Sequence, residues 1–118
     1  MAKPSKCISV SEAQGLQDNW VQSRVSSISN LLNEEDARDF TFSVDDLQEY
    51  IDYVKEESAK AGITNPGIRI FFAAYDNKDN NKATVFLGAT DGTQSDSDNN
   101  YNIDPLNKGL GGWPPNEY

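Results

Sequence analysis

Oxygen-bearing side chains alternate along one short stretch near the C-terminal end, in the pattern D-x-D-x-N-x-N-x-D. The residues are Asp96, Asp98, Asn100, Asn102 and Asp104. Oxygen ligands at alternate positions of a tight loop are what a hard cation such as calcium requires. The stretch departs from an EF-hand because it lacks the central glycine and the terminal bidentate glutamate. A second, sparser candidate set is Asp76, Asp79 and Asn81.

Both sets also fit a simpler interpretation, because Asp, Asn and Ser form soluble turns without binding a metal. The chain has no histidine, and Cys7 is its only cysteine. A metal site could therefore use no imidazole and at most one thiolate. We expect solvated turns here in preference to a calcium site, and we expect no cofactor.

The same inventory limits catalysis. Without histidine, Ser-His-Asp, Cys-His and His-ligated zinc chemistry are excluded. Arg69, Tyr75 and Tyr101 are candidate binding groups near an apolar sheet, and a carboxylate could act as a base if burial raised its pKa. No activated nucleophile, phosphate loop or paired-carboxylate motif accompanies them. An enzyme is the less favoured interpretation, and we expect Arg69 to pair with a carboxylate.

Trp113 is a fourth candidate binding residue, within the run GLGGWPP at residues 109–115. Proline makes this run rigid at one end, and glycine leaves it free at the other. Trp113 could therefore fill an open edge of the core or be presented to a partner. The first alternative is favoured.

Residues 40–75 carry the clearest signals of secondary structure. Ser43 is expected to cap a helix that begins at Val44, and Gly62 supplies the left-handed position after its end. An apolar stripe runs along this helix at spacings of three and four: Val44, Leu47, Ile51, Val54, Ser58 and Ala61. Residues 68–75 then form a strand that is apolar on both faces, so we expect it to be central in its sheet.

Three further elements complete the expected order. Ser11 is expected to cap a long amphipathic helix that runs to Asn33, and residues 40–42 form a short strand. Residues 82–89 return antiparallel to 68–75, whereas 40–42 and 68–75 form a βαβ unit and should be parallel. The sequence predicts an α+β fold, with two amphipathic helices on one face of a small mixed sheet of three or four strands in the order α-β-α-β-β.

The length of 118 residues suits one domain. Residues 1–9 show no periodicity and are expected to form a flexible lead-in. From residue 90 onward Gly, Asn, Asp and Pro recur too often for a regular helix. Apolar residues are nevertheless spaced through 90–118, which predicts an irregular segment that packs on the domain.

The chain is strongly acidic, with ten Lys and Arg residues against nineteen Asp and Glu and a formal charge of -9. Such a charge repels nucleic-acid phosphates and anionic lipid surfaces, so we expect neither as a partner. A basic protein partner fits it. The N-terminus lacks the apolar run of a signal peptide, and no stretch approaches a membrane span, which predicts a soluble cytoplasmic protein.

Three segments together resemble a known group of proteins. They are FSVDDLQEYIDYVKEESAKAGITNPGIRIFFAAY, TVFLGAT and PLNKGLGGWPP. With them, the chain from about Ile8 to its end resembles an uncharacterised family of small bacterial α+β proteins with no assigned activity. The resemblance implies no ligand, activity or catalytic residue.

These observations favour a non-catalytic protein-binding module, in the manner of small inhibitors, immunity proteins or antitoxins. Its acidic surface would mainly speed association with a basic partner. Two alternatives remain from the residues alone. One is a small-ligand-binding protein or small enzyme that uses the sheet face near Arg69 and Tyr75, and the other is a calcium-binding loop at residues 96–104.

Overall fold

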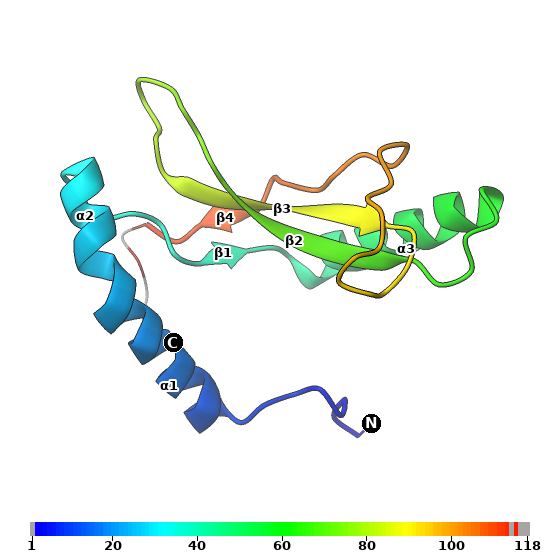
Figure 1. Cartoon of the computed structure of the whole chain (residues 1–118), viewed down its shortest axis with the longest axis horizontal. Helices are drawn as coiled ribbons and strands as arrows, with labels where there is room; N and C mark the ends of the chain where they lie inside the picture. The colour runs from blue at the N-terminus through cyan, green and yellow to red at the C-terminus, as the bar shows by residue number, and fades with distance from the viewer. Residues whose placement is uncertain (1, 114, 116–118) are drawn as a thin grey trace. The chain divides into compact units, whose positions relative to one another are not determined.

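The computed structural model of the chain describes residues 2–113 and 115, and this part is α+β (Figure 1). Its elements are α1 (Val10–Trp20), the π-helical η1 (Val21–Val25), α2 (Ser26–Leu32), β1 (Phe40–Thr41), α3 (Val44–Lys60), β2 (Gly67–Ala74), β3 (Ala83–Thr90) and β4 (Leu110–Gly111). Residues 114 and 116–118 of the expected irregular segment lie outside the described residues. Within the described part, no helix is long and apolar enough to cross a membrane.

The chain divides into two compact units. One is Ala37–Gly112, called here the sheet unit, and the other holds the N-terminal residues up to Asp36 together with Trp113. The expectation of a single domain over residues 1–118 stays a prediction. So does the packing of the first helix on the sheet.

The N-terminal helix runs without a break through α1, η1 and α2, as the spacing predicts, but it begins earlier than expected. Its N-cap is Ser9, whose hydroxyl oxygen accepts a hydrogen bond from the Glu12 N–H at 3.0 Å. The prediction of Ser11 is therefore wrong, and the Ser9 hydroxyl also lies 3.4 Å from the Glu12 carboxylate, to which it donates. The helix ends where Asn33 adopts the left-handed conformation, with φ 58°.

Helix α3 begins and ends as the sequence predicts. The Ser43 hydroxyl oxygen accepts from the Asp46 N–H at 2.9 Å, and Gly62 has φ +79°. The predicted apolar stripe is only partly confirmed. Val44 is exposed, whereas the buried residues of the helix are Tyr50, Val54 and Ser58. The helix is thus turned so that an aromatic side chain beside Ile51 faces the core.

Strands β2 and β3 form the expected antiparallel hairpin, in a register that runs from Gly67 opposite Thr90 to Ala74 opposite Ala83. The central position predicted for β2 is wrong, since within the described residues the sheet is β2-β3 and β2 is an edge. The other side of β3 is bridged by Leu106, whose backbone exchanges two hydrogen bonds with Leu87 at 2.8 and 2.9 Å.

Strand β1 does not take part in a βαβ unit. It pairs antiparallel with β4, with Phe40 opposite Gly111 and Thr41 opposite Leu110. The predicted parallel pair and mixed sheet are therefore wrong for the described chain, which holds two separate antiparallel pairs. The reason is that the segment after residue 90 returns along β1 and supplies its partner.

The core of the sheet unit lies between α3, β3 and the irregular segment. Its buried members are Tyr50, Val54, Leu87, Ala89 and Ile103, with Phe42, Leu47 and Leu106 packed against them. The Tyr50 hydroxyl lies within hydrogen-bond distance of two carbonyl oxygens, 3.1 Å from that of Leu87 and 3.0 Å from that of Asp104. Burial raises the pKa of the Tyr50 phenol, and the charges of Tyr53 and Asp104 raise it further.

Candidate functional site

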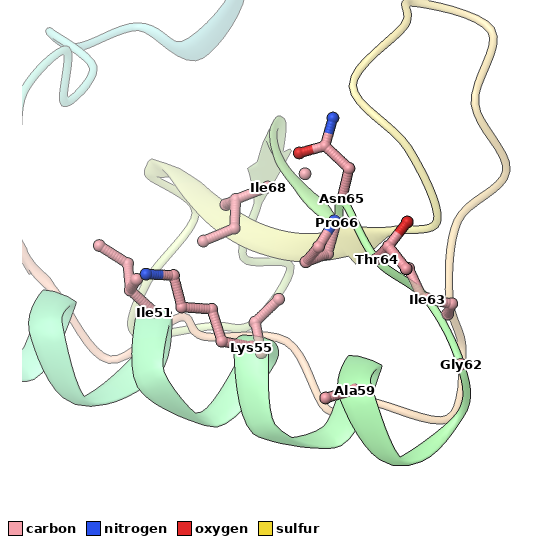
Figure 2. Close-up of a pocket in the computed structure, with 11 residues that line it drawn as sticks. Ile51, Lys55, Ala59, Gly62, Ile63, Thr64, Asn65, Pro66 and Ile68 are labelled. Atoms are coloured by element: carbon pink, nitrogen blue, oxygen red, sulfur yellow. The ribbon is translucent and has the colours of Figure 1, made fainter.

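A groove runs between α3 and the start of β2 (Figure 2). Its volume is about 690 Å³, and its lining is Ile51, Val54, Lys55, Ala59, Gly62, Ile63, Thr64, Asn65, Pro66, Gly67 and Ile68. Figure 2 shows the side chains of Ile51 and Lys55 rising from the helix toward Ile68. Lys55 is the one charged residue of this lining, so the groove is an apolar surface with a single cation at its wall.

Local backbone chemistry fixes the turn that closes one end of the groove. The Ile63 N–H donates to the Ser58 carbonyl at 2.9 Å across the left-handed Gly62, which ends the helix and redirects the chain. A Cβ added to Gly67 would lie 2.5 Å from the Thr90 hydroxyl oxygen and 2.7 Å from the Gly92 carbonyl oxygen. Glycine therefore lets β2 begin in close contact with the end of β3.

The outer edge of β2 is open beside this groove. Leu87 directs its N–H and C=O toward Leu106, away from β2. Ile70 lies opposite Leu87 in the register, so its backbone groups point away from β3 as well. Because a strand repeats its orientation every second residue, the backbone N–H and C=O groups of Ile68 and Phe72 also point away from β3. No strand or bridge in the described chain pairs with this edge.

The side chains of the same three β2 residues are exposed. Ile68 is 37% exposed, Ile70 65% and Phe72 92%. The β3 residues opposite Ile70 and Phe72 on this face, Leu87 and Val85, are buried. The sheet face is therefore covered over β3 and uncovered over β2. This combination of the open edge and the three side chains is called here the β2 edge.

The opposite face of the hairpin is closed by the loop that follows β3. The Arg69 guanidinium donates to the Asn99 side-chain oxygen at 2.7 Å and to the carbonyl oxygens of Ser97 and Ser95 at 3.0 and 3.1 Å. The expectation that Arg69 pairs with a carboxylate is wrong, because its hydrogen-bond acceptors are a side-chain amide oxygen and backbone carbonyl oxygens of the loop. Arg69 thus holds a loop in place.

Tyr101 shares a partner with Arg69. The Asn99 side-chain amide donates to the Tyr101 hydroxyl at 3.4 Å, yet Tyr101 remains 88% exposed. It borders a cavity of about 220 Å³ next to the stacked rings of Phe71 and Phe86, whose centroids are 4.8 Å apart. The structure therefore brings two of the four predicted binding residues together.

The other two predicted binding residues lie elsewhere. The Tyr75 hydroxyl donates to the Asn107 side-chain oxygen at 3.1 Å. Trp113 belongs to the N-terminal unit, is exposed, and donates from its indole N–H to the Glu35 carbonyl at 3.0 Å. Trp113 therefore does not fill a core. A ligand-binding role for Arg69, Tyr75, Tyr101 and Trp113 stays a prediction.

The alternating stretch from Asp96 to Asp104 is built as a series of turns. The Asn100 side-chain oxygen accepts from the Asn102 N–H at 3.0 Å, and the Asp104 carbonyl accepts from Tyr50. Among the residues that the structure describes, no three carboxylate or thiol side chains are grouped as metal ligands. The sparser set is also built on turns, in which Asn77 accepts from Asp79.

Calcium is expected to raise the melting temperature of the chain no more than sodium chloride does at equal ionic strength. Both salts screen the -9 charge, whereas a bound ion at a concentration ~100 times its Kd would add about 2.7 kcal/mol. Thermal unfolding in the two salts measures the difference. A calcium-specific rise of several degrees that Asp98→Asn removes would contradict this expectation.

Comparisons of the chain with known protein families, with characterised proteins and with solved structures found no match. The resemblance to a bacterial family stays a prediction. The groove and the β2 edge, neither of which is apparent in the sequence pattern, are the structural features that bear on function.

Proposed function

We propose that the protein is a non-catalytic protein-binding module that binds an extended segment of a partner as an additional strand on the β2 edge. The observation that carries this proposal is the open edge itself, with exposed apolar side chains beside an apolar groove. Strand addition uses the backbone of an edge for affinity and neighbouring pockets for specificity.

The geometry of the edge suits such a segment. The outward backbone groups of Ile68, Ile70 and Phe72 offer hydrogen bonds to an incoming main chain. Every second side chain of that segment would point to the face of the groove, where Ile51 and Ile63 supply apolar contacts. The favoured segment therefore alternates apolar residues with other types.

The charge of the protein favours a basic partner. Four acidic residues follow one another along α3 at spacings of four, three and four: Asp45, Glu49, Asp52 and Glu56. All four are exposed, and Asp52 and Glu56 directly follow the groove residues Ile51 and Lys55. Lysine or arginine in the partner segment would be attracted to this row, mainly through a faster association.

A catalytic or small-ligand role near Arg69 and Tyr75 finds less support. Both terminal nitrogens of the Arg69 guanidinium already donate to the loop after β3. The groove offers Lys55 as its one ionisable side chain, which suits binding better than acid–base chemistry.

Selection of random peptides displayed on phage against the immobilised chain tests the proposal. The selected peptides are expected to alternate apolar residues and to be rich in lysine and arginine. Phe72→Lys is expected to weaken their binding at least tenfold, because it places a charge where an apolar side chain must pack. Binding is measured by fluorescence anisotropy with synthetic copies of the peptides.

The matched control is Tyr101→Lys, which also replaces a highly exposed aromatic residue but lies away from the groove. It is expected to bind the peptides as the unaltered chain does. Failure to select any peptide, or equal binding by the two variants, would show that the β2 edge is not a binding site.

A further inference from the structure

We infer that a second copy of this chain binds the β2 edge, so that two β2 strands pair antiparallel about a two-fold axis at Ile70 and join the two hairpins into one four-stranded sheet. The inference rests on the β2 edge being a binding site, as proposed above, and it gives that edge a second occupant besides a basic partner segment. Symmetric association through the same patch on both copies is the commonest form of protein oligomer.

The backbone geometry closes in this register. Ile70 lies on the axis and therefore faces Ile70 of the second copy. Ile68 of each copy faces Phe72 of the other. These are the residues whose N–H and C=O groups point outward, so each can enter a hydrogen-bonded antiparallel pair. Arg69 then lies opposite Phe71 rather than opposite a second Arg69, which avoids two like charges facing each other.

The apolar side chains of the β2 edge in one copy can pack against the same side chains of the second copy. A two-fold axis perpendicular to the sheet keeps the same face of both hairpins on one side, so both α3 helices lie on that side. The exposed side chains of Ile68, Ile70 and Phe72 from the two copies then meet in the space between the helices. Ile51, which rises from α3 toward this space, adds a second layer to the contact (Figure 2).

The exposed area indicates how strong the dimer is. Phe72 alone exposes about 200 Å², and the three side chains together expose roughly 400 Å² in each copy. A standard interface buries about 800 Å² on each partner. The three side chains therefore supply about half of a standard interface, so the dimer is expected to be weak and to form at micromolar concentrations or above.

The charge distribution allows association in spite of the -9 charge on each copy. Residues 68–74 contain no Asp or Glu, and their one charged side chain, Arg69, is bonded to the loop on the opposite face. The repulsion between copies is therefore long-range and is screened by salt. Salt should strengthen a dimer of like-charged chains and weaken the binding of a basic partner.

Sedimentation equilibrium of the full chain, from micromolar to submillimolar concentration and at low and high salt, tests the inference. The expected result is a monomer–dimer equilibrium that is tighter at high salt. Ile70→Pro is expected to weaken it at least tenfold, because proline removes an outward N–H that the ladder with β3 does not use. Phe72→Lys should do the same if the proline variant does not fold, and Tyr101→Lys should have no effect.

Disulfide cross-linking tests the register. In a Cys7→Ser background, Ile70→Cys places two thiols across the axis with Cα atoms about 5.5 Å apart, which suits a disulfide. Ile68→Cys alone is the control, since its symmetry mate lies about 14 Å away. A mixture of the Ile68→Cys and Phe72→Cys chains should cross-link again.

A chain that stays monomeric at every concentration and salt, or an Ile68→Cys chain that cross-links as fast as the Ile70→Cys chain, overturns the inference. If that monomeric chain still binds the selected peptides through Phe72, the proposed binding function stands and only the dimer is wrong. A chain that neither dimerises nor binds the peptides overturns both.

Discussion

Replacing Tyr50 with alanine is expected to lower the free energy of unfolding by about 3–5 kcal/mol, the usual cost of deleting a buried aromatic ring. Tyr50 is the largest side chain of the buried core cluster, and its hydroxyl joins α3 to β3 and to the irregular segment. Urea unfolding followed by circular dichroism measures the loss. Glu49→Ala, on an exposed side of the same helix, is the control and should cost less than about 1 kcal/mol.

Tyr50→Phe separates the ring from the hydroxyl. It keeps the packing but removes the donor that two carbonyl oxygens share. The Leu87 carbonyl still accepts from the Leu106 N–H, so the Asp104 carbonyl loses more. We expect a loss of about 1–2 kcal/mol. A loss as large as that of Tyr50→Ala would mean that packing of the ring contributes little.

The raised pKa of the Tyr50 phenol adds a pH signature to the same pair of chains. An exposed tyrosine ionises near pH ~10. Because burial and the neighbouring charges raise the pKa in the folded state, the unfolded chain releases this proton first. The contribution of Tyr50 to stability is therefore fully present below pH ~10 and is lost as the pH rises through the folded pKa. Unfolding midpoints should fall more steeply there than for Tyr50→Phe; parallel curves would contradict the shift.

Ile103→Ala is the second substitution with a large expected effect, about 2–5 kcal/mol. Ile103 lies in a segment without helix or strand, yet it is almost fully buried among Tyr50, Val54 and Leu87. The irregular segment is therefore part of the core. Denaturant unfolding measures the loss, and the slope with denaturant should not change if the same surface is exposed on unfolding.

Tyr101→Ala is the matched control for Ile103→Ala, because it lies two residues away and is exposed. It should change the free energy of unfolding by no more than about 0.5 kcal/mol. Equal effects of the two substitutions would show that the segment does not pack on α3 and β3.

Local signals sufficed for the elements that depend on neighbouring residues. Ser43 and Gly62 mark the ends of α3 because a cap and a left-handed glycine act over three or four residues, and the β2-β3 hairpin follows from two apolar runs around a polar loop. Burial along α3 was predictable only in part. Tyr50 is flanked in the sequence by acidic residues, and its hydroxyl is hydrogen-bonded to a carbonyl oxygen 54 positions along the chain. A local sequence pattern cannot reveal such a contact.

Pairing between distant strands was the main failure. Strands β1 and β4 have two residues each, and their pairing depends on the path of the C-terminal segment. A strand that is apolar on both faces usually lies inside a sheet, and β2 does not. The groove was missed because it arises where α3 covers β3 and leaves β2 uncovered. The predicted candidates Arg69 and Tyr75 were polar residues whose hydrogen bonds lie within the protein.

The open edge of β2 also has a consequence for the solubility of the chain in a cell. The run Ile70–Ala74, IFFAA, is short, apolar and uncharged and contains no proline, which is the composition of segments that stack into amyloid. A bound strand hides this run. Chains whose β2 edge stays uncovered are therefore the ones expected to form insoluble fibres, so the solubility of the protein depends on the fraction of chains whose edge is covered.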